Sequence, residues 1–255
     1  MTVSDLFRLD GKVALVTGAS RGLGAGIARA LADAGADVIV HANATPAEAT
    51  ASAVAKAGRR SHALIANLEQ DGAAATLAAQ AIDVFGRVDI LVNNAGTIRR
   101  SPAAEHPDAD WDTVIAVNLS SVFRLSRAIG KHMLMRDDGG KIINVASLLA
   151  FQGGITVPAY AAAKGGVAQL TKALANEWAS KRINVNAIAP GYMETDNTTA
   201  LRQDATRVRQ ITERIPAGRW GQPEDLGGAA VFLASGASDY VHGHVLVVDG
   251  GWMGR

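Results

Sequence analysis

The chain has 255 residues, and its 48% hydrophobic and 19% charged residues are typical of a folded protein rather than a disordered one. Because 25 Lys and Arg nearly balance 24 Asp and Glu, with a formal net charge of +1 and no block of like charges, we expect no nucleic-acid partner. The chain has no cysteine, no signal peptide and no run of about 20 apolar residues, so we expect a cytoplasmic protein with no disulfides and no membrane partner.

Short β-branched strands alternate with Ala-rich helices along the chain. In chain order the patterns predict a strand at 12–17, a helix at 24–34, a strand at 37–41, a helix at 46–57, a strand at 61–66, a helix at 71–85, a strand at 88–92, one long or two abutting helices at 110–135, a strand at 141–146, a helix at 160–181, a strand at 183–188, a helix at 224–234 and a strand at 244–248. Such alternation is typical of parallel sheets, and nearly all-apolar strands indicate that helices cover both faces. We therefore predict an α/β fold: a single Rossmann-type domain over residues 1–255, built on a doubly wound parallel sheet with helices on both faces.

A polar segment interrupts the alternation after the strand at 183–188. Ligands of doubly wound sheets bind beyond the carboxyl ends of the strands, and this segment follows one such end. We therefore expect residues 193–215 to form a substrate lid, because lids exclude water from a site and complete it.

Three glycines lie between the first strand and the first helix. Glycine accepts positive φ angles and lets a pyrophosphate approach the backbone, while N–H groups at the start of the helix face the phosphates. A glycine-rich turn in this context is typical of dinucleotide-binding proteins. We expect the loop to bind a dinucleotide through Gly18, Ser20, Arg21, Gly22, Leu23 and Gly24.

The end of the second strand bears on the choice between the two nicotinamide cofactors. An acid there would bind the 2′-hydroxyl of NAD, but the strand ends in His41, Ala42 and Asn43. Arg21 can give a charge-assisted hydrogen bond to a 2′-phosphate, and Asn43 is a further donor. We therefore expect NADP(H) to be favoured over NAD(H).

Tyr160 and Lys164 are spaced i, i+4 on one predicted helix and so share a face. A free tyrosine has a pKa near ~10, and a nearby ammonium lowers that pKa because it favours the phenolate. Ser147 directly follows the fifth strand, where its hydroxyl can hold a substrate oxygen beside Tyr160. Asn118, between the fourth and fifth strands, can anchor a water linked to Lys164. These four residues are the predicted catalytic set.

With these motifs the chain resembles the classical short-chain dehydrogenase/reductases over essentially its whole length. The matching motifs are TGASRGLG at 17–24, NNAG at 93–96, Asn118, Ser147, YAAAK at 160–164 and PG at 190–191. The resemblance implies an NAD(P)-dependent enzyme that acts on a CH–OH group, with the four residues above as its catalytic tetrad. Family members are commonly tetramers, so the resemblance also implies a homotetramer, with the helices at 110–135 and 160–181 in its interface.

The same resemblance implies further contacts with the cofactor. Residues 93–96 would line the adenine-ribose side, and Ile188 would flank the nicotinamide. The remaining contacts implied are Asn67, Leu68, Asn94, Ala95, Gly96, Tyr160, Lys164, Pro190, Gly191, Met193 and Thr195. Asn67 stands where the family usually has Asp, and its carbonyl oxygen can still meet the adenine amino group.

Several loops also resemble the sugar-acid branch of this family, which holds 2-dehydro-3-deoxy-D-gluconate 5-dehydrogenase, 2-deoxy-D-gluconate 3-dehydrogenase and the gluconate 5-dehydrogenases. The segments are TIRR at 97–100, SLLAFQGGITVPAY at 147–160, NEWA at 176–179, INVNAIAPGYMETDNT at 183–198, RIPAGRWG at 214–221 and VDGGW at 248–252. The resemblance implies a small sugar-acid substrate and one of the first two activities. Arg99 and Arg100 can bind the substrate carboxylate, and Gln152 its hydroxyls, beside Ser147 and Tyr160.

Two other interpretations remain open. The chain can be a reductase of another carbonyl, such as a 3-oxoacyl thioester or a polyol, or a nucleotide-sensing protein without catalysis. The joint presence of Ser147, Tyr160 and Lys164 argues against the sensing protein. The six histidines do not cluster with acids at ligand spacing, so we expect no metal site.

Overall fold

Seven parallel strands form one sheet in the order β3-β2-β1-β4-β5-β6-β7, in a computed structural model that describes residues 2–255. The strands are β1 (Val13–Val16), β2 (Asp37–Ala42), β3 (Ser61–Ile65), β4 (Ile90–Asn93), β5 (Gly140–Val145), β6 (Ile183–Pro190) and β7 (Val245–Val248). The predicted doubly wound parallel sheet is confirmed, and each predicted strand is present with its ends shifted by a residue or two.

The helices follow the predicted alternation. They are α1 (Val3–Leu6), α2 (Gly22–Asp33), α3 (Glu48–Lys56), α4 (Ala73–Phe85), α5 (Asp108–Ile115), α6 (Ser121–Arg136), α7 (Pro158–Trp178), α8 (Thr199–Arg202), α9 (Ala205–Arg214) and α10 (Gly227–Ala234). A single π turn at Ala116–Ser120 separates α5 from α6, so the segment predicted as one long or two abutting helices is two. The polar segment after β6 is itself helical, since α8 and α9 lie within it. No helix that the structure describes is long and apolar enough to cross a membrane.

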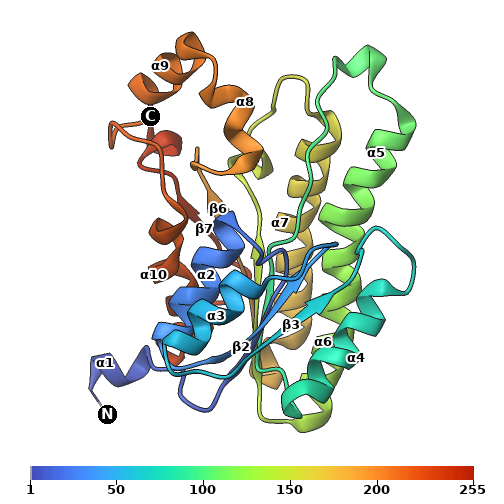
Figure 1. Ribbon diagram of the computed structural model, residues 1–255, viewed down its shortest axis with the longest axis vertical. Helices are drawn as coiled ribbons and strands as arrows, with labels where there is room; N and C mark the ends of the chain where they lie inside the picture. Colours follow the sequence, from blue (N-terminus) through green and yellow to red (C-terminus); the bar gives the residue numbers. More distant parts are fainter. Residues whose placement is uncertain (1) are drawn as a thin grey trace.

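Side chains on the two faces of the sheet pack into separate cores. Because successive residues of a strand point to opposite faces, Ala14 and Val16 of β1 face one core, and Val13 and Leu15 face the other. The first core lies against α2, α3 and α10, and the second lies against α4, α6 and α7 (Figure 1). Helices on both faces therefore bury the nearly all-apolar strands, which explains why these strands lack polar alternation.

A chain of buried polar side chains ties two helices to the middle of the sheet. The amide of Asn93 on β4 donates to Ser126 Oγ of α6 at 3.0 Å and to Asn144 Oδ1 of β5 at 2.8 Å. Asn144 in turn donates to Thr171 Oγ1 of α7 at 2.9 Å. Asn93 therefore belongs to the core and does not line the adenine-ribose side as predicted. The network fixes α7, which carries two of the predicted catalytic residues, against β5.

The chain order reverses between β1 and β4, which are neighbours in the sheet. In open α/β sheets such a switch point opens a crevice at the carboxyl ends of the strands, and ligands bind there. The loops that follow β1 to β6 all leave the sheet at this edge, so residues far apart in the sequence meet above it.

Candidate active site

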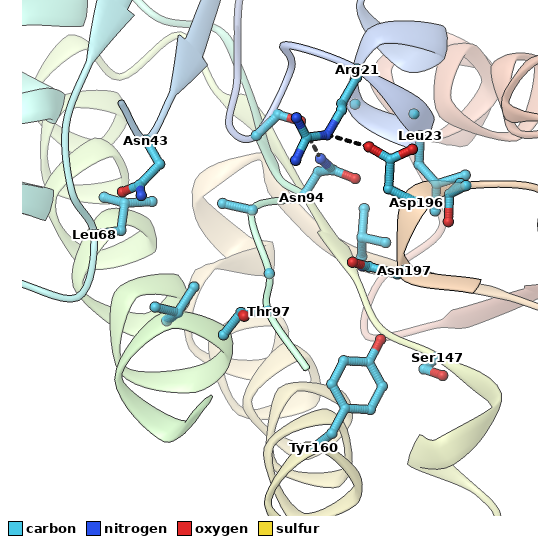
Figure 2. Close-up of a pocket in the computed structure, with 18 of the residues that line it drawn as sticks. Arg21, Leu23, Asn43, Leu68, Asn94, Thr97, Ser147, Tyr160, Asp196 and Asn197 are labelled. Atoms are coloured by element: carbon cyan, nitrogen blue, oxygen red, sulfur yellow. Dashed lines mark hydrogen bonds and ion pairs between the residues drawn. The ribbon is translucent and has the colours of Figure 1, made fainter. Parts of the chain in front are cut away.

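A cavity of about 440 Å³ opens at the carboxyl ends of the strands, and the loops after β1 to β6 line it. Asn43 and Leu68 lie toward one end of this cavity, and Ser147 and Tyr160 lie toward the other (Figure 2). Of the residues predicted to contact the cofactor, all but Asn93 and Ile188 line it: Gly18, Ser20, Arg21, Gly22, Leu23, Gly24, Asn43, Asn67, Leu68, Asn94, Ala95, Gly96, Tyr160, Lys164, Pro190, Gly191, Met193 and Thr195. Ile188 does not line it, because its side chain is fully buried in the core against α2 and α10.

The glycine-rich loop after β1 takes a conformation that other residues resist. Gly18 and Gly22 have φ angles of +62° and +56°, and a Cβ at Gly24 would collide with the Gly18 carbonyl oxygen. Asn94 fastens this loop from the neighbouring strand, because its amide donates to Thr17 O at 2.8 Å and to Gly18 O at 3.0 Å. The Asn94 amide thus holds the wall of the cavity.

The start of α2 offers free backbone donors to the cavity. The side chain of its N-cap residue, Arg21, accepts no hydrogen bond from the first turn of the helix. The first N–H groups of α2 are therefore not capped by that side chain. Gly22, Leu23 and Gly24 at this end line the cavity. Uncapped donors at the positive end of a helix are suited to phosphate oxygens, so this donor set fits the pyrophosphate of a dinucleotide.

His41, near the end of β2, fixes the other side of the glycine-rich loop. Its side chain is 1% exposed; Nδ1 accepts from Gly18 N at 3.3 Å and Nε2 donates to Ala66 O at 2.9 Å. Only the neutral ring with its proton on Nε2 makes both bonds. Burial lowers the pKa of His41 and so favours this neutral form.

Arg21 reaches across the cavity to the segment after β6. Its Nε lies 2.6 Å from Asp196 Oδ2, and both residues line the cavity. Figure 2 shows this contact as a dashed line between Arg21, from the loop after β1, and Asp196, from the segment after β6. The two loops also approach each other closely beside this pair. A Cβ atom added to Gly22 would lie 3.6 Å from the methyl group of Thr195.

The opposite end of the cavity is shaped by the loop after β3. Asn67 Oδ1 accepts from Glu69 N at 3.1 Å, a local turn that orients the amide beside Leu68. Glu69 accepts a hydrogen bond from Thr113 Oγ1 of α5 at 2.8 Å. Asn67, Leu68 and Glu69 line the cavity here, and the Asn67 oxygen keeps a second lone pair for a ligand donor.

Ser147 and Tyr160 form the hydroxyl pair of the cavity. Ser147 begins a short turn after β5, where its Oγ accepts from Leu149 N at 3.2 Å, and Tyr160 projects from the first turn of α7. Burial raises the pKa of Tyr160 above its ordinary value of 10.0, and the Ser147 hydrogen bond and the positive charge of Arg100 oppose that rise. The protein therefore holds Tyr160 as a neutral phenol, a proton donor, at ordinary pH.

Lys164 lies one turn further along α7 and is 4% exposed. Its Nζ donates to Val145 O at 2.5 Å and lies 5.6 Å from the centroid of the Tyr160 ring. Burial lowers the pKa of Lys164 to about 8. The net shift of the Tyr160 pKa is upward because burial of the phenol outweighs the groups that lower it, and Lys164 Nζ is directed at the Val145 carbonyl. The predicted lowering of the Tyr160 pKa by Lys164 stays a prediction.

Asn118 lies in the π turn between α5 and α6 and is fully buried. Its Oδ1 accepts from Thr97 N at 2.8 Å, and its Nδ2 donates to Thr97 O at 2.7 Å. Both ends of the amide are thus used to hold the loop after β4. Asn118 does not line the cavity, so its side chain is a positioning group. The predicted anchoring of a water linked to Lys164 stays a prediction.

The predicted substrate residues separate into three kinds. Arg99 lines the cavity, with its Nε 3.5 Å from Asp110 Oδ1. Arg100 lies just outside the lining, but its charge reaches Tyr160. Gln152 is not in the cavity, because its Oε1 accepts from Trp252 Nε1 at 3.2 Å, and this bond ties the Ser147 loop to the C-terminal segment.

The cavity includes residues that the sequence reasoning missed. They are His41, Ala66, Glu69, Thr97, Thr113, Val117, Val145, Ala146, Asp196, Asn197 and Thr198. His41, Ala66, Val145 and Ala146 lie at or directly after the end of a strand, so their position at the carboxyl edge was available as a signal, and Asp196, Asn197 and Thr198 fall within the predicted lid. Thr113 and Val117 lie within the helical segment between β4 and β5, where nothing in the sequence indicated that these side chains line a cavity. Among residues 2–255, no three His, Asp or Glu side chains gather as metal ligands would.

Known proteins with closely similar sequences cover almost the whole chain. A family model described as enoyl-(acyl carrier protein) reductase matches residues 18–253. The 2-dehydro-3-deoxy-D-gluconate 5-dehydrogenase of Pseudoalteromonas atlantica is 56% identical over 98% of both chains, and that of Dickeya dadantii is 52% identical over 99% of this chain and 100% of its own. A crystal structure of a gluconate 5-dehydrogenase from Burkholderia cenocepacia in complex with NADP and tartrate is 40% identical, with a TM-score of 0.94 over 100% of both chains.

The neutral ring of His41 predicts an acid-sensitive contribution to stability. The folded state lowers the pKa of His41 below 6.5. The stabilisation of the fold by the neutral ring is therefore complete above pH 6.5 and is lost as the pH falls from 6.5 through the pKa of the folded state. His41→Asn keeps an acceptor for Gly18 N–H but does not titrate. The difference in Tm between pH 7.5 and pH 5.5, measured by thermal unfolding, should be smaller in His41→Asn than in the wild-type protein, whatever the cost of the substitution at neutral pH. An equal difference in the two proteins would contradict the assigned role.

Proposed function

The chain belongs to the short-chain dehydrogenase/reductase family, and from this premise we propose that it interconverts a secondary alcohol and a ketone on a sugar acid with an NAD(P) cofactor. The first candidate activity is that of a 2-dehydro-3-deoxy-D-gluconate 5-dehydrogenase, which relatives of 52% and 56% identity carry. A 2-deoxy-D-gluconate 3-dehydrogenase activity is the second. The observation that carries the proposal is that Ser147 and Tyr160 line the same cavity, whose donor set fits a dinucleotide.

The residues of the cavity divide between holding the cofactor and moving a proton. The uncapped start of α2 would hold the pyrophosphate, and Asn67 and Leu68 would flank the adenine. Pro190, Gly191, Met193 and Thr195 line the end near Tyr160, where they would flank the nicotinamide. When bound, the nicotinamide supplies the hydride acceptor or donor.

Tyr160 is the proposed acid–base group. It donates its proton to the substrate oxygen when a ketone is reduced and takes a proton back when an alcohol is oxidised. Ser147 holds the same substrate oxygen in place by a hydrogen bond. Lys164 is within 5.6 Å of the Tyr160 ring, and we assign it to the cofactor ribose and to the charge balance of the phenol. Asn118 keeps the loop after β4 in register through Thr97.

Arg100 is the proposed anchor for the substrate carboxylate. It forms no ion pair with any residue in the described range 2–255, whereas Arg99 is paired with Asp110. Its positive charge lowers the pKa of Tyr160, which supports a role at the reacting end of the cavity. A free guanidinium suits a carboxylate because it offers two parallel donors.

NADP(H) is the proposed preferred cofactor. No acid ends β2, so a 2′-phosphate meets no negative charge from that strand, and Arg21 lines the cavity as a cation. The relative from B. cenocepacia was solved with NADP, which supports use of the phosphorylated cofactor.

We also propose a lid, a tetramer and a cytoplasmic location. Residues 193–215 begin in the cavity lining and continue into α8 and α9, where Ile211 and Ile215 pack with Trp220 and Trp252.

A homotetramer would cover the apolar side chains that α5 and α6 expose: Trp111, Phe123, Leu134 and Met135. The absence of cysteine suits the reducing cytoplasm.

A substrate panel tests the proposed function directly. The wild-type enzyme should oxidise 2-dehydro-3-deoxy-D-gluconate or a related hexonate with either nicotinamide cofactor and turn over the neutral polyol of the same length poorly. Nucleotide absorbance gives kcat/KM for each pair. Turnover of a 3-oxoacyl thioester or a polyol in preference to every sugar acid would favour another carbonyl reductase, and binding of cofactor without any turnover would favour a sensing protein.

Tyr160→Phe removes the proton donor but keeps the ring. Its kcat should fall by about 10²–10⁴-fold, the range expected when general acid–base catalysis is lost. Cofactor affinity, measured by nucleotide fluorescence, should change little. Wild-type turnover in this variant would remove Tyr160 from the mechanism.

Arg100→Gln removes the proposed carboxylate anchor. Its kcat/KM for the sugar acid should fall by about tenfold or more, the low end for a charge-assisted hydrogen bond, while that for a neutral polyol should not fall. Arg99→Gln, one residue earlier on the same loop, is the matched comparison and should lose less. A larger loss in Arg99→Gln would assign the carboxylate to Arg99 instead.

A further inference from the structure

The ion pair between Arg21 and Asp196 joins two loops that both line the proposed cofactor cavity. Arg21 belongs to the glycine-rich loop after β1, and Asp196 opens the short 3₁₀ turn after β6. Their charged atoms lie 2.6 Å apart, and neither side chain forms another ion pair with the residues that the structure describes. The pair is therefore a contact that the chain makes with itself in the space reserved for a ligand.

The geometry leaves both partners open to replacement. The side chains of Arg21 and Asp196 are 78% and 69% exposed, so water screens the pair and competes with it. Ion pairs with this exposure are weak, and a stronger anion can take the cation from its partner. A phosphate monoester is such an anion, because it carries up to two negative charges and three acceptor oxygens.

Arg21 is also the cation on which a preference for NADP(H) depends. It is the basic residue of the glycine-rich loop that lines the cavity, and the end of β2 supplies only neutral groups, among them the buried neutral ring of His41. A 2′-phosphate that binds Arg21 must displace Asp196 or lie beside its carboxylate. Either arrangement costs binding energy that NAD(H), which lacks this phosphate, does not lose.

We propose that Asp196 is a cofactor-specificity residue that weakens the preference for NADP(H) by competing with the 2′-phosphate for Arg21. The inference rests on the proposed use of a nicotinamide cofactor, but it needs no assumption about the sugar acid. In this arrangement Arg21 favours the phosphorylated cofactor, and Asp196 limits that advantage so that NAD(H) also binds. Binding of the phosphorylated cofactor frees Asp196, and with it the first turn of residues 193–215, from the glycine-rich loop.

Nucleotide binding to four proteins tests this proposal without any turnover. NADPH and NADH are titrated into the wild type, Asp196→Asn, Arg21→Ala and the double variant, and Kd is read from nucleotide fluorescence. Adenosine 2′,5′-bisphosphate and AMP serve as fragment probes that differ only in the 2′-phosphate. Asp196→Asn should tighten the binding of NADPH and of the bisphosphate by about two- to fivefold, the range measured for exposed ion pairs, and leave the Kd values of NADH and AMP within experimental error. In the Arg21→Ala background the same substitution should have no effect.

Glu194→Gln is the matched control. It removes one negative charge from the same segment, but Glu194 does not line the cavity and forms no ion pair within residues 2–255. It should leave the ratio of the two Kd values unchanged. A shift in Glu194→Gln equal to that in Asp196→Asn would show a general charge effect and overturn the proposal.

The other outcomes are equally decisive. An equal change in the Kd values of NADPH and NADH in Asp196→Asn would show that Asp196 has only a structural role in its segment. Tighter NADPH binding that persists in the Arg21→Ala background would show that Asp196 does not act through Arg21. If Asp196→Asn tightens NADPH selectively but the wild-type enzyme oxidises no sugar acid in the substrate panel, the proposed substrate would be rejected and this inference would stand. Binding of neither nucleotide by the wild type would reject the proposed function itself, and this inference with it.

Discussion

The parallel pairing of seven strands is the constraint from which the site follows. Parallel strands place every carboxyl end at one edge of the sheet, and the reversal of chain order between β1 and β4 opens a crevice there. The loops after six strands then meet around one cavity. Residues as distant in sequence as Gly18 and Thr195 become neighbours without any loop having to travel far.

Side chains that bond to backbone hold these loops in place. Asn94 joins the loop after β4 to the glycine-rich loop, His41 joins that loop to the end of β3, and Asn118 holds Thr97. Each is a neutral group with its hydrogen bonds satisfied at low exposure, so it rigidifies the wall of the cavity at little electrostatic cost. Burial acts alike on the two titrating groups that α7 contributes to the cavity: it favours the neutral phenol of Tyr160 and lowers the pKa of Lys164. The neutral phenol of Tyr160 is the form that donates a proton when a ketone is reduced, whereas oxidation of an alcohol requires Tyr160 to accept one.

The sequence predicted the order of strands and helices because apolar runs and glycine punctuation are local signals. It also predicted which loops meet, since the carboxyl ends of parallel strands coincide. It failed where orientation depends on distant partners. Gln152 seemed free for a substrate, but its partner is Trp252, 100 residues away. Ile188 lies on a cavity-side strand but faces the core, and Asp196 gained its role only through the fold that brings it to Arg21.

The most direct test of the account follows the hydride. 2-Dehydro-3-deoxy-D-gluconate that carries deuterium at C5 is incubated with the wild-type enzyme and oxidised nicotinamide nucleotide, and both products are analysed by mass spectrometry. The account predicts that one deuterium appears in the reduced nucleotide and that the sugar acid gains a ketone at C5. Oxidation with the deuterium retained in the sugar acid would move the reaction to another carbon, and an absence of both products would contradict the assignment of a 2-dehydro-3-deoxy-D-gluconate 5-dehydrogenase activity.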